Sequence, residues 1–470
     1  MNVDTVIVGA GTAGLAALRE VRRYTDDFLL INDGHWGTTC AAVGCMPSKA
    51  LIEVANAYHH RTLFQQFGLR GADALHADIP AVLAHVRELR DGFVKGPESV
   101  PEELGDRAVQ GRARLQGPGC VEVNGKVINA RAIILAPGSR PVVPESWQAY
   151  GNRILTTDSL FEQQNLPQRI AVIGMGAIGV EIAQALARLG ISVAAFDNTE
   201  RLAGIADDEV LAAFRPLLAR ELTMHLGGRA SLEQAGDYLR VIGAGGEFEA
   251  DAVLAAMGRQ PNIEGLGLES LGVPLNDRGM PTIDPTTLRI GDLPVFLVGD
   301  ANSQRPLLHE AADEGYIASQ FAAPGADPQG FCRRTPLSVV FCSPQVAHVG
   351  QDMTGVPESQ KVSGSADFSG QGRIRITGKA AGILKVHADA QTGKLLAADM
   401  CIPYAEHLAH LLALAIEQSM TVQQMLAMPF YHPVVEEGLR SALRDLAKRL
   451  PDKGQSDLSR CPDIGHDALD

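Results

Sequence analysis

The sequence predicts an α/β protein with two Rossmann-like dinucleotide-binding domains and a C-terminal α+β domain. One observation is a strand–Gly-x-Gly-x-x-Gly–helix run that occurs twice, near the N-terminus and again from residue 170. The other is a change after residue 335, where short segments typical of antiparallel strands alternate with helices. The length of 470 residues agrees, because a chain of this size is expected to form more than one hydrophobic core.

Composition limits the classes of protein and partner. Hydrophobic residues make up 46% and charged residues 20%, which is typical of a folded protein. The net charge is −14 and no long basic run occurs, so nucleic acid and anionic membranes are poor candidate partners. No apolar run is long enough to span a membrane and the N-terminus begins as a strand, so we expect a cytoplasmic location. Seven cysteines form no disulfide framework in a chain this long, so a close cysteine pair is more typical of catalysis.

The first dinucleotide-binding unit begins with an apolar strand over residues 3–8. The glycine motif follows at once, and a helical pattern covers residues 15–24. Gly9 permits the tight turn, Gly11 lets the backbone approach a pyrophosphate, and Gly14 lets the helix pack closely on the strand. Because the helix N-terminus then faces the phosphates, this context predicts a bound dinucleotide.

Two cysteines stand close together ahead of a second helical segment. Residues 37–49 read Gly-Thr-Thr-Cys-Ala-Ala-Val-Gly-Cys-Met-Pro-Ser-Lys. A metal site would need further cysteines or histidines at short spacing, and none lies nearby in the sequence. Two interpretations remain: a pair of inert buried thiols, or a redox dithiol whose thiolate is stabilised by the helix N-terminus.

The residues that flank the pair favour the redox dithiol. The stretch resembles the G-G-T-C-x-N-x-G-C-x-P-x-K signature of the pyridine nucleotide-disulfide oxidoreductases, with Ala42 in place of the Asn. The resemblance implies that Cys40 and Cys45 form a redox-active disulfide, in which Cys40 exchanges with substrate and Cys45 faces the flavin ring. It also implies an ion pair between Lys49 and Glu181 near the flavin. We therefore expect FAD and NAD as cofactors, and no metal.

The adenosine ribose of FAD is expected to bind after the second strand, residues 28–31. By the family's spacing to the first cysteine, Asn32 occupies the place of the usual Glu, and Asp33 follows it. Either Asp33 reaches the ribose or Asn32 binds it without a charge. Both are candidate cofactor-binding residues.

A second strand–fingerprint–helix run contains Gly174, Gly176 and Gly179. Two such units imply two bound dinucleotides, whereas a duplication that binds nothing would be unusual beside a redox dithiol. The next strand ends at Asp197, and a carboxylate there favours the free 2′-hydroxyl of NAD over the phosphate of NADP. Arg201 is close enough in the sequence to keep NADP as an alternative.

Two short motifs resemble the points where the family's chain leaves each nucleotide-binding domain. The first resembles A-T-G-S-x-P and has Pro137 in place of the Thr, followed by Gly138. The second resembles G-R-x-P-N and begins at Gly258. The resemblance implies that both glycines lie beside a bound cofactor.

An apolar strand ending in a carboxylate follows over residues 294–300. In the family the Asp at this place binds the ribityl chain of the flavin, so Asp300 and the adjacent Ala301 are expected at the cofactor. Residues 308–315 continue the match into the closing helix of that domain. His309 is expected on the flavin side or on the face of that helix.

The last part of the chain resembles the family's interface domain, up to about residue 450. The expected strands cover residues 336–341, 346–350, 372–376, 382–388 and 394–400. The expected helices cover residues 404–419, 422–428 and 434–449. The expected domains are an FAD-binding domain (1–145 and 263–334), an NAD-binding domain (146–262), a dimerisation domain (335–450) and a polar tail (451–470) with a lone Cys461.

The segment Phe-Tyr-His-Pro-Val-Val-Glu-Glu, residues 430–437, resembles the family's H-x-H-P-T-x-x-E. The resemblance implies that His432 is the catalytic base and that Glu437 orients it. Phe430 and Val434 replace a His and a Thr, which marks a departure from the family's pattern.

Within the family, Asp197 and the sequence of residues 46–49 favour the dihydrolipoamide dehydrogenase branch. The expected reaction is oxidation of dihydrolipoamide, free or carried by a protein of a multienzyme complex, with reduction of NAD⁺. The resemblance also implies a homodimer in which the last domain of one chain completes the site of its partner. Two alternatives stay open. In the first, the chain is an NAD(P)H-dependent reductase of glutathione, a coenzyme A disulfide or another small disulfide. In the second, it is a flavoprotein that serves mainly as a binding subunit of a lipoyl complex.

Overall fold

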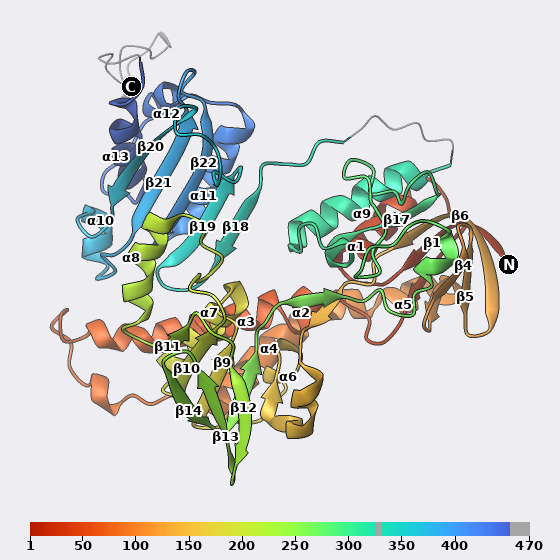
Figure 1. The fold of residues 1–470 in the computed structure, drawn as a ribbon, viewed down its shortest axis with the longest axis horizontal. Helices are drawn as coiled ribbons and strands as arrows, with labels where there is room; N and C mark the ends of the chain where they lie inside the picture. The colour runs from red at the N-terminus through yellow and green to blue at the C-terminus, as the bar shows by residue number, and fades with distance from the viewer. Residues whose placement is uncertain (325–330, 452–470) are drawn as a thin grey trace. The chain divides into compact units, whose positions relative to one another are not determined.

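A computed structural model describes residues 1–324 and 331–451 of the chain (Figure 1). Residues 452–470 of the predicted tail, with Cys461, lie outside the described residues. The described residues form two compact units. The first unit comprises Met1–Leu51, Asp78–Leu166 and Leu254–Arg333, and the second comprises Ile52–Ala77, Pro167–Val253 and the described residues from Arg334. Within the described ranges, no helix is long and apolar enough to cross a membrane.

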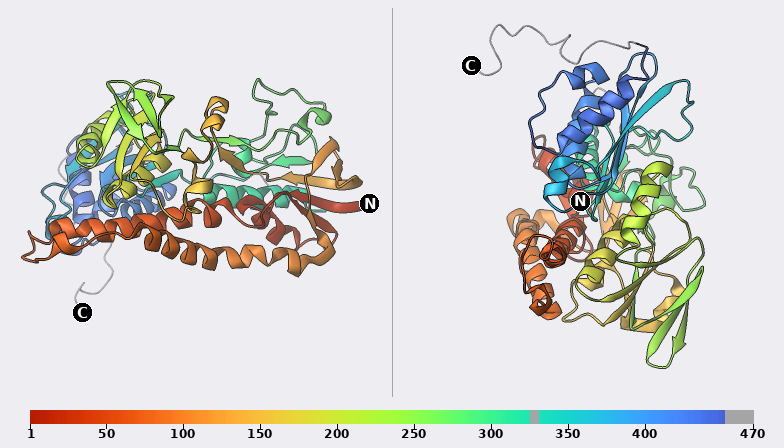
Figure 2. Two further views of the ribbon diagram at one scale, coloured as in Figure 1. Left: turned by 90° about the horizontal axis from the view of Figure 1, so that it is seen from below. Right: turned by 90° about the vertical axis from the view of Figure 1, so that its left-hand side faces the viewer.

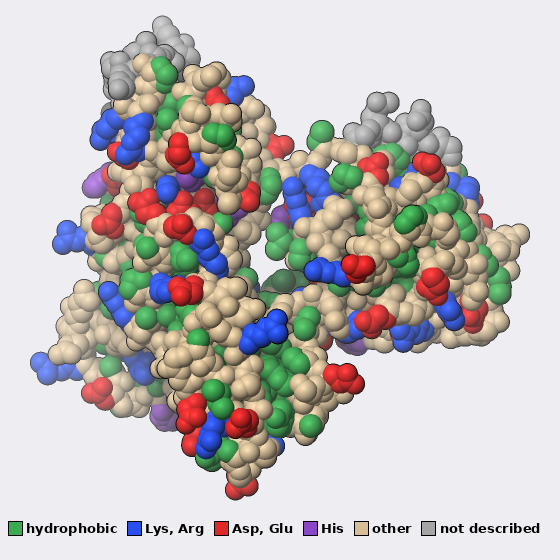
Figure 3. Space-filling model, viewed as in Figure 1, with side chains coloured by type: hydrophobic (Ala, Val, Ile, Leu, Met, Phe, Trp, Pro, Cys, Tyr) green, Lys and Arg blue, Asp and Glu red, His purple; other side chains and the backbone are tan. Residues whose placement is uncertain are grey.

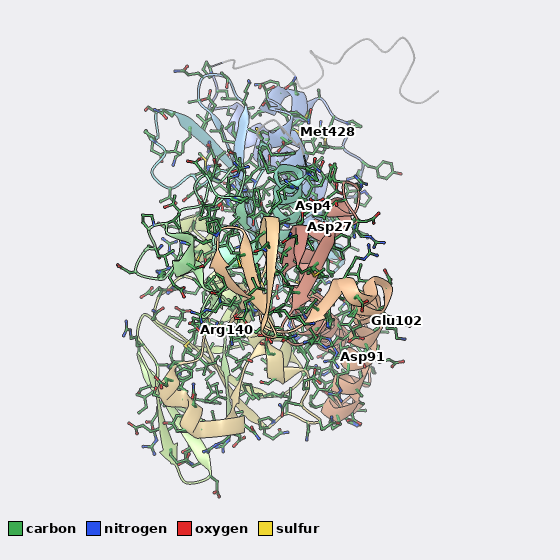
Figure 4. All side chains as sticks on the ribbon, turned by 90° about the vertical axis from the view of Figure 1, so that its right-hand side faces the viewer. Asp4, Asp27, Asp91, Glu102, Arg140 and Met428 are labelled. Atoms are coloured by element: carbon green, nitrogen blue, oxygen red, sulfur yellow. The ribbon has the colours of Figure 1, made fainter. Side chains whose placement is uncertain are left out.

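A seven-stranded sheet forms the centre of the first unit. Its strands are, in spatial order, β3 (Ala108–Gln110), β2 (Phe28–Asn32), β1 (Asn2–Val8), β6 (Lys126–Leu135), β5 (Cys120–Val123) and β4 (Arg114–Gly117), with β17 (Val295–Leu297) also paired to β6. The pairs of β1 with β2 and β6, of β2 with β3 and of β6 with β17 are parallel. The carboxyl ends of these parallel strands therefore lie at the same edge of the sheet, which is where open α/β sheets bind ligands. Figure 4 shows Asp4 and Asp27 where the strands begin and Arg140 toward the opposite end.

Apolar side chains cover both faces of this sheet, as expected for parallel strands buried on two sides. Ile7, Leu30 and Ile134 pack with α1 (Thr12–Val21) and α9 (Leu308–Ala322) on one face (Figure 1). The two helices approach closely, because a Cβ on Gly315 would lie 2.2 Å from the carbonyl oxygen of Ala13. This contact fixes α1, which begins within the first glycine motif, after Gly11.

The other elements of the first unit connect its motifs. The helices are α2 (Thr39–Ala42), α4 (Ile79–Glu98), α5 (Val100–Leu104) and α6 (Thr157–Leu160), and α3 (Cys45–His59) begins here. The short strands are β7 (Ser139–Pro141), β8 (Ile154–Leu155) and β16 (Arg259–Pro261). β7 and β16 pair as an antiparallel ribbon.

The second unit contains the second glycine motif. Its parallel strands are β11 (Thr223–Leu226), β10 (Ser192–Asp197) and β9 (Arg169–Ile173), and β15 (Ala252–Ala255) lies beyond β9. The helices of this part are α7 (Ala177–Arg188) and α8 (Asp208–Leu218). A separate antiparallel sheet contains β12 (Ser231–Ala235), β13 (Tyr238–Gly243) and β14 (Gly246–Ala250).

An antiparallel sheet of five strands forms the C-terminal part of the second unit. Its order is β18 (Leu337–Val340), β19 (Gln345–Gly350), β22 (Leu395–Ile402), β21 (Ile383–Asp389) and β20 (Lys361–Asp367). Helices α11 (Ala405–Glu417), α12 (Val422–Leu426) and α13 (Glu436–Ala447) share a buried apolar core with one face of this sheet (Figure 2). The other face includes the polar side chains of Lys385, His387 and Asp399 and is called the polar face below.

One strand expected from the sequence is wrong. Residues 372–376 form the short helix α10, although their Ile residues alternate as in a strand. The side chain of Gln371 accepts a hydrogen bond from the backbone N–H of Ile374 at 2.8 Å, which closes a helical turn. Ile374 is buried and Ile376 is 62% exposed, so the two do not share a sheet face. The fifth strand is β20, which no sequence pattern predicted.

Candidate functional site

The first glycine motif forms a close turn in front of α1. Gly9 has a φ of +102°, and a Cβ there would lie 2.2 Å from the carbonyl oxygen of Ala136. A Cβ on Gly14 would lie 1.8 Å from the carbonyl oxygen of Gly9, so only glycine fits. At Gly11, by contrast, no described atom lies within 4 Å of such a Cβ. This open space at the helix N-terminus is suited to a pyrophosphate, as the sequence predicts.

A pocket of about 440 Å³ lies beside this turn. The two candidate ribose contacts differ in how they are engaged. Asn32 is buried, and its Oδ1 accepts from the Ala10 N–H at 3.0 Å while its Nδ2 donates to the carbonyl oxygen of His35 at 2.9 Å. Asp33 is exposed, with a carboxylate oxygen 4.0 Å from Nε of Arg112. The pocket therefore fits the adenosine end of FAD, with Asp33 as the accessible acceptor.

The cysteine pair lies where two helices meet. Cys40 is in α2 and Cys45 is the first residue of α3. The side chain of Thr38 caps α2 by accepting from the Ala41 N–H at 3.0 Å. No disulfide joins the two cysteines, and a hydrogen bond between them together with burial raises the pKa of Cys40. Lys49 acts in the opposite direction. The two sulfur atoms are thus close enough to share a proton in the reduced state.

Three motifs that are far apart in the sequence meet at the C-terminal ends of the parallel strands. The ribbon of β7 and β16 brings the two exit motifs together, with positive φ at Gly138 and Gly258. The hydroxyl of Ser139 donates to Oδ2 of Asp300 at 2.7 Å and accepts from Nε of Arg259 at 2.8 Å. Asp300, the predicted flavin contact, is thereby held in place by two neighbouring motifs.

A buried carboxylate that the sequence analysis did not identify holds the turn that carries Asp300. Oε2 of Glu314 accepts from the Gly299 N–H and from Nδ2 of Asn302, each at 2.6 Å, and Ala301 is buried between them. Oε1 of Glu314 accepts from the guanidinium of Arg333. Burial raises the pKa of Glu314, although Arg333 and the other hydrogen bonds oppose this. Glu314 therefore anchors the predicted flavin contact.

The second glycine motif repeats the geometry of the first. Gly174 has a φ of +98°. No described atom lies within 4 Å of a Cβ placed on Gly176, which leaves space at the N-terminus of α7. Gly179 is buried within that helix. The motif fits the pyrophosphate of a second dinucleotide.

The carboxylate of Asp197 lies at the end of β10, beside this motif. Its oxygens accept from the Met175 N–H at 2.6 Å and from the Thr199 N–H at 2.8 Å. Arg201, the residue that kept NADP as an alternative, has its guanidinium 2.7 Å from a carboxylate oxygen of Asp208. The Arg201–Asp208 pair is exposed to solvent, so the preference for NAD over NADP rests on the carboxylate of Asp197.

Glu181 is buried in α7, and its Oε1 accepts from the Phe341 N–H at 2.8 Å. Gln184, one turn later, exchanges two hydrogen bonds with the backbone of Ser343, at 2.7 and 2.8 Å. No sequence motif predicted a role for Gln184. Lys49 belongs to the first unit and Glu181 to the second, so their ion pair stays a prediction.

The predicted base and its orienting acid are in contact. Nδ1 of His432 lies 2.9 Å from Oε1 of Glu437, while Oε2 accepts from the Val434 N–H at 3.2 Å. The hydrogen bond with His432 lowers the pKa of Glu437, assisted by Val434. The His432 side chain is 80% exposed, so Nε2 is free to meet a substrate or another chain.

Comparison with known protein families gives two matches that together cover most of the chain. Residues 3–315 match the pyridine nucleotide-disulphide oxidoreductase model, and residues 337–443 match the dimerisation domain of the same family.

Individual relatives and solved structures agree. The chain is 32% identical to a dihydrolipoyl dehydrogenase of Thermus scotoductus over 95% of this chain and 98% of the relative. It is 29% identical to a dihydrolipoyl dehydrogenase of Haloferax volcanii over 94% of this chain and 95% of the relative. Among solved structures, LpdA from Mycobacterium tuberculosis superposes with a TM-score of 0.81 at 23% identity, over 94% of this chain and 99% of that chain. The HOCl-induced flavoprotein disulfide reductase RclA from Escherichia coli gives 0.79 at 20% identity, over the same shares.

Proposed function

The chain belongs to the pyridine nucleotide-disulfide oxidoreductase family, and we propose that it oxidises a dihydrolipoyl group with NAD⁺ through Cys40 and Cys45. It is an oxidoreductase that uses FAD and NAD(H). The relatives named dihydrolipoyl dehydrogenase support the substrate class. The observation in this chain that carries the proposal is the hydrogen-bonded thiol pair at the start of α3.

The first chemical step is removal of a proton from a substrate thiol. Only a thiolate attacks a disulfide, so a base must stand at the site. Glu437 accepts a hydrogen bond from Nδ1–H of His432, which leaves Nε2 as the acceptor of the substrate proton. The ionised carboxylate also stabilises the imidazolium that forms.

Two exchange steps then move two electrons into the protein. The substrate thiolate attacks Sγ of Cys40 in the oxidised pair, an S–S bond forms between them, and Cys45 leaves as a thiolate. The second substrate thiol then attacks the first substrate sulfur, its proton passes to the sulfur of Cys40, and Cys40 is released as a thiol while His432 holds the first proton. The substrate leaves as a cyclic disulfide, and Cys40 and Cys45 carry the two electrons. The raised pKa of Cys40 suits this state, since Cys40 retains a proton next to the departing thiolate of Cys45.

The first unit supplies the elements that would hold FAD: the glycine turn, Asp33 and Asp300. Bound FAD supplies the two-electron transfer between the dithiol and the nicotinamide. We propose domain limits of 1–145 with 263–334 for FAD, 146–262 for NAD and 335–450 for dimerisation, and a cytoplasmic location. The boundary between the two family matches, at residues 315–337, supports residue 335 as the start of the dimerisation domain.

We further propose that each active site is shared across a two-fold dimer. The exposed His432 belongs to the part of the chain that matches the family's dimerisation domain, and the cysteines belong to the first unit. Two-fold symmetry lets the same contact form twice. To test this, Cys45→Ser and His432→Gln chains are co-expressed and verified heterodimers are purified. Each homodimer is expected to be nearly inactive. The heterodimer, with one site free of both lesions, is expected to recover up to half of the wild-type rate. Inactive heterodimers would contradict shared sites.

The substrate proposal is tested with a panel of dithiols and disulfides. NAD⁺ with dihydrolipoamide is expected to give the highest kcat/KM, above NAD(P)H with glutathione disulfide or coenzyme A disulfide. A higher value with either disulfide would assign the chain to a different reductase. Binding of a lipoyl carrier with almost no turnover would instead indicate a binding subunit.

A further inference from the structure

The polar face of the C-terminal sheet contains a buried cluster that the proposed reaction does not use. Asp207, His387 and Asp399 each offer one ligand atom, and these atoms lie within 4.8 Å of one another. Asp207 caps the N-terminus of α8, while His387 and Asp399 project from the neighbouring strands β21 and β22. All three belong to the second unit. The cluster therefore joins the start of α8 to the sheet.

The imidazole of His387 has one engaged and one unengaged nitrogen. Its side chain is 4% exposed, and Nδ1 lies 2.7 Å from the hydroxyl of Ser363. Nε2 is buried, and no atom of the described residues makes a hydrogen bond of normal length to it. Its nearest carboxylate oxygen, Oδ2 of Asp399, is 3.5 Å away, too far for a good N–H···O bond. Since a buried polar atom without a hydrogen bond destabilises the folded state, the position of Nε2 calls for a physical explanation.

The spacing and surroundings of these atoms resemble those of metal ligands. Two ligands of a tetrahedral Zn²⁺, each about 2.0–2.2 Å from the ion, are roughly 3.4 Å apart, close to the separation of His387 and Asp399. Metal-bound histidines and carboxylates are usually held by further hydrogen bonds. Ser363 does this for His387, and Nδ1 of His348 lies 2.8 Å from the other oxygen of Asp399.

The local charge also leaves room for a cation. Among the described residues, Asp207 and Glu209 share one lysine, Lys385, whose ammonium is 2.8 Å from Asp207 and 3.1 Å from Glu209. Asp399 is paired with His348 and His387 instead of a lysine. Lys385 can remain paired with Glu209 when the carboxylate of Asp207 binds an ion. Figure 3 shows acidic side chains gathered over this part of the second unit. Asp207 is partly exposed, which gives an ion access from solvent.

We propose that Asp207, His387 and Asp399 bind a divalent first-row transition ion of the Zn²⁺ class, with water completing the coordination. One imidazole and two carboxylates suit Zn²⁺, Co²⁺ or Mn²⁺ better than an ion that requires thiolates or oxygen ligands alone. The ion ties α8 to the C-terminal sheet and stabilises the second unit.

The test uses the full-length, flavin-loaded protein with Cys40→Ser and Cys45→Ser, because a reduced dithiol would itself bind zinc. Equilibrium dialysis against micromolar Zn²⁺, followed by metal analysis, is expected to find one ion per chain and a raised Tm. Co²⁺ is expected to give a d–d spectrum without thiolate charge-transfer absorption. No bound ion in this protein, or thiolate absorption from bound Co²⁺, would overturn the proposal. Neither result depends on whether a cluster variant folds.

Added substitutions locate the ion. His387→Gln is expected to abolish binding, and Ser363→Ala to weaken it by about 10- to 100-fold, as for other residues that orient a ligand. His407→Gln is the matched control, since that histidine is 71% exposed and outside the cluster. Equal binding by the His387→Gln and His407→Gln proteins would refute the site.

Discussion

Replacing Glu437 with Gln is predicted to damage the catalytic base more than removing the side chain altogether. Both oxygens of Glu437 accept hydrogen bonds, one from His432 at 2.9 Å and one from the Val434 N–H at 3.2 Å. A Gln side chain has one oxygen and one NH₂ group, so it can accept from only one of these donors. The amide oxygen can therefore accept from the imidazole or from the Val434 N–H, but not from both.

The free-energy costs of losing each hydrogen bond show which arrangement the amide adopts. The N–H of Val434 is partly buried and fixed, and leaving it unsatisfied costs about 1–3 kcal/mol. His432 can avoid such a loss by moving its proton to Nε2 and accepting from the new NH₂ group at Nδ1. That tautomer cannot accept a substrate proton. Glu437→Gln therefore loses the whole contribution of a positioned base, about 10²- to 10⁴-fold, similar to His432→Gln. Glu437→Ala loses one charge-assisted hydrogen bond of about 1.5–3 kcal/mol, or roughly 10- to 150-fold.

The assay separates the two half-reactions by anaerobic stopped flow. Reduction of the bound flavin by dihydrolipoamide needs the base and is expected to slow in the order wild type, Glu437→Ala, Glu437→Gln. Reduction by NADH does not need His432 and serves as the internal control. A Glu437→Gln protein that oxidises dihydrolipoamide as fast as Glu437→Ala or faster would refute this account of the dyad.

Three further predictions concern the cofactor-binding elements. Gly14→Ala places a Cβ 1.8 Å from the Gly9 carbonyl oxygen, so the purified protein is expected to lack FAD absorbance; normal flavin content would contradict the tight turn. Glu314→Gln replaces one carboxylate oxygen with an NH₂ group, so the side chain cannot accept from both the Gly299 N–H and the Arg333 guanidinium. The free energy of unfolding measured in urea is expected to fall by about 1–3 kcal/mol, and an unchanged midpoint would argue against the anchor. Asp197 is expected to favour NAD over NADP by about 10- to 10³-fold in kcat/KM, and equal values would contradict its proposed role.

Local motifs were predictable from the sequence because the residues that form them are adjacent. The glycine turn at Gly9, the thiol pair and the contact of His432 with Glu437 each depend on a few consecutive residues. Their geometry agrees with the patterns that predicted them. The α/β fold class is confirmed by the sheets and by the family matches.

Contacts between distant segments were not predictable in this way. Glu314 binds Gly299 from a different element, and His387 lies near Asp207 although the two stand in distant parts of the sequence. No short sequence pattern identifies pairs of residues that are far apart in the chain. Residues 372–376 show the converse, because an alternating pattern favoured a strand and one glutamine cap closed a helical turn instead.

The most direct test of the proposed function follows two electrons through the cysteine pair. Oxidised wild-type protein, with FAD bound, is mixed anaerobically with one equivalent of dihydrolipoamide per chain and then with NAD⁺. Close to one NADH per chain is expected, and Cys45→Ser with the same flavin content is expected to give almost none. NADH formation by Cys45→Ser at the wild-type level, or none by the wild type, would contradict electron transfer from a dihydrolipoyl group through Cys40 and Cys45.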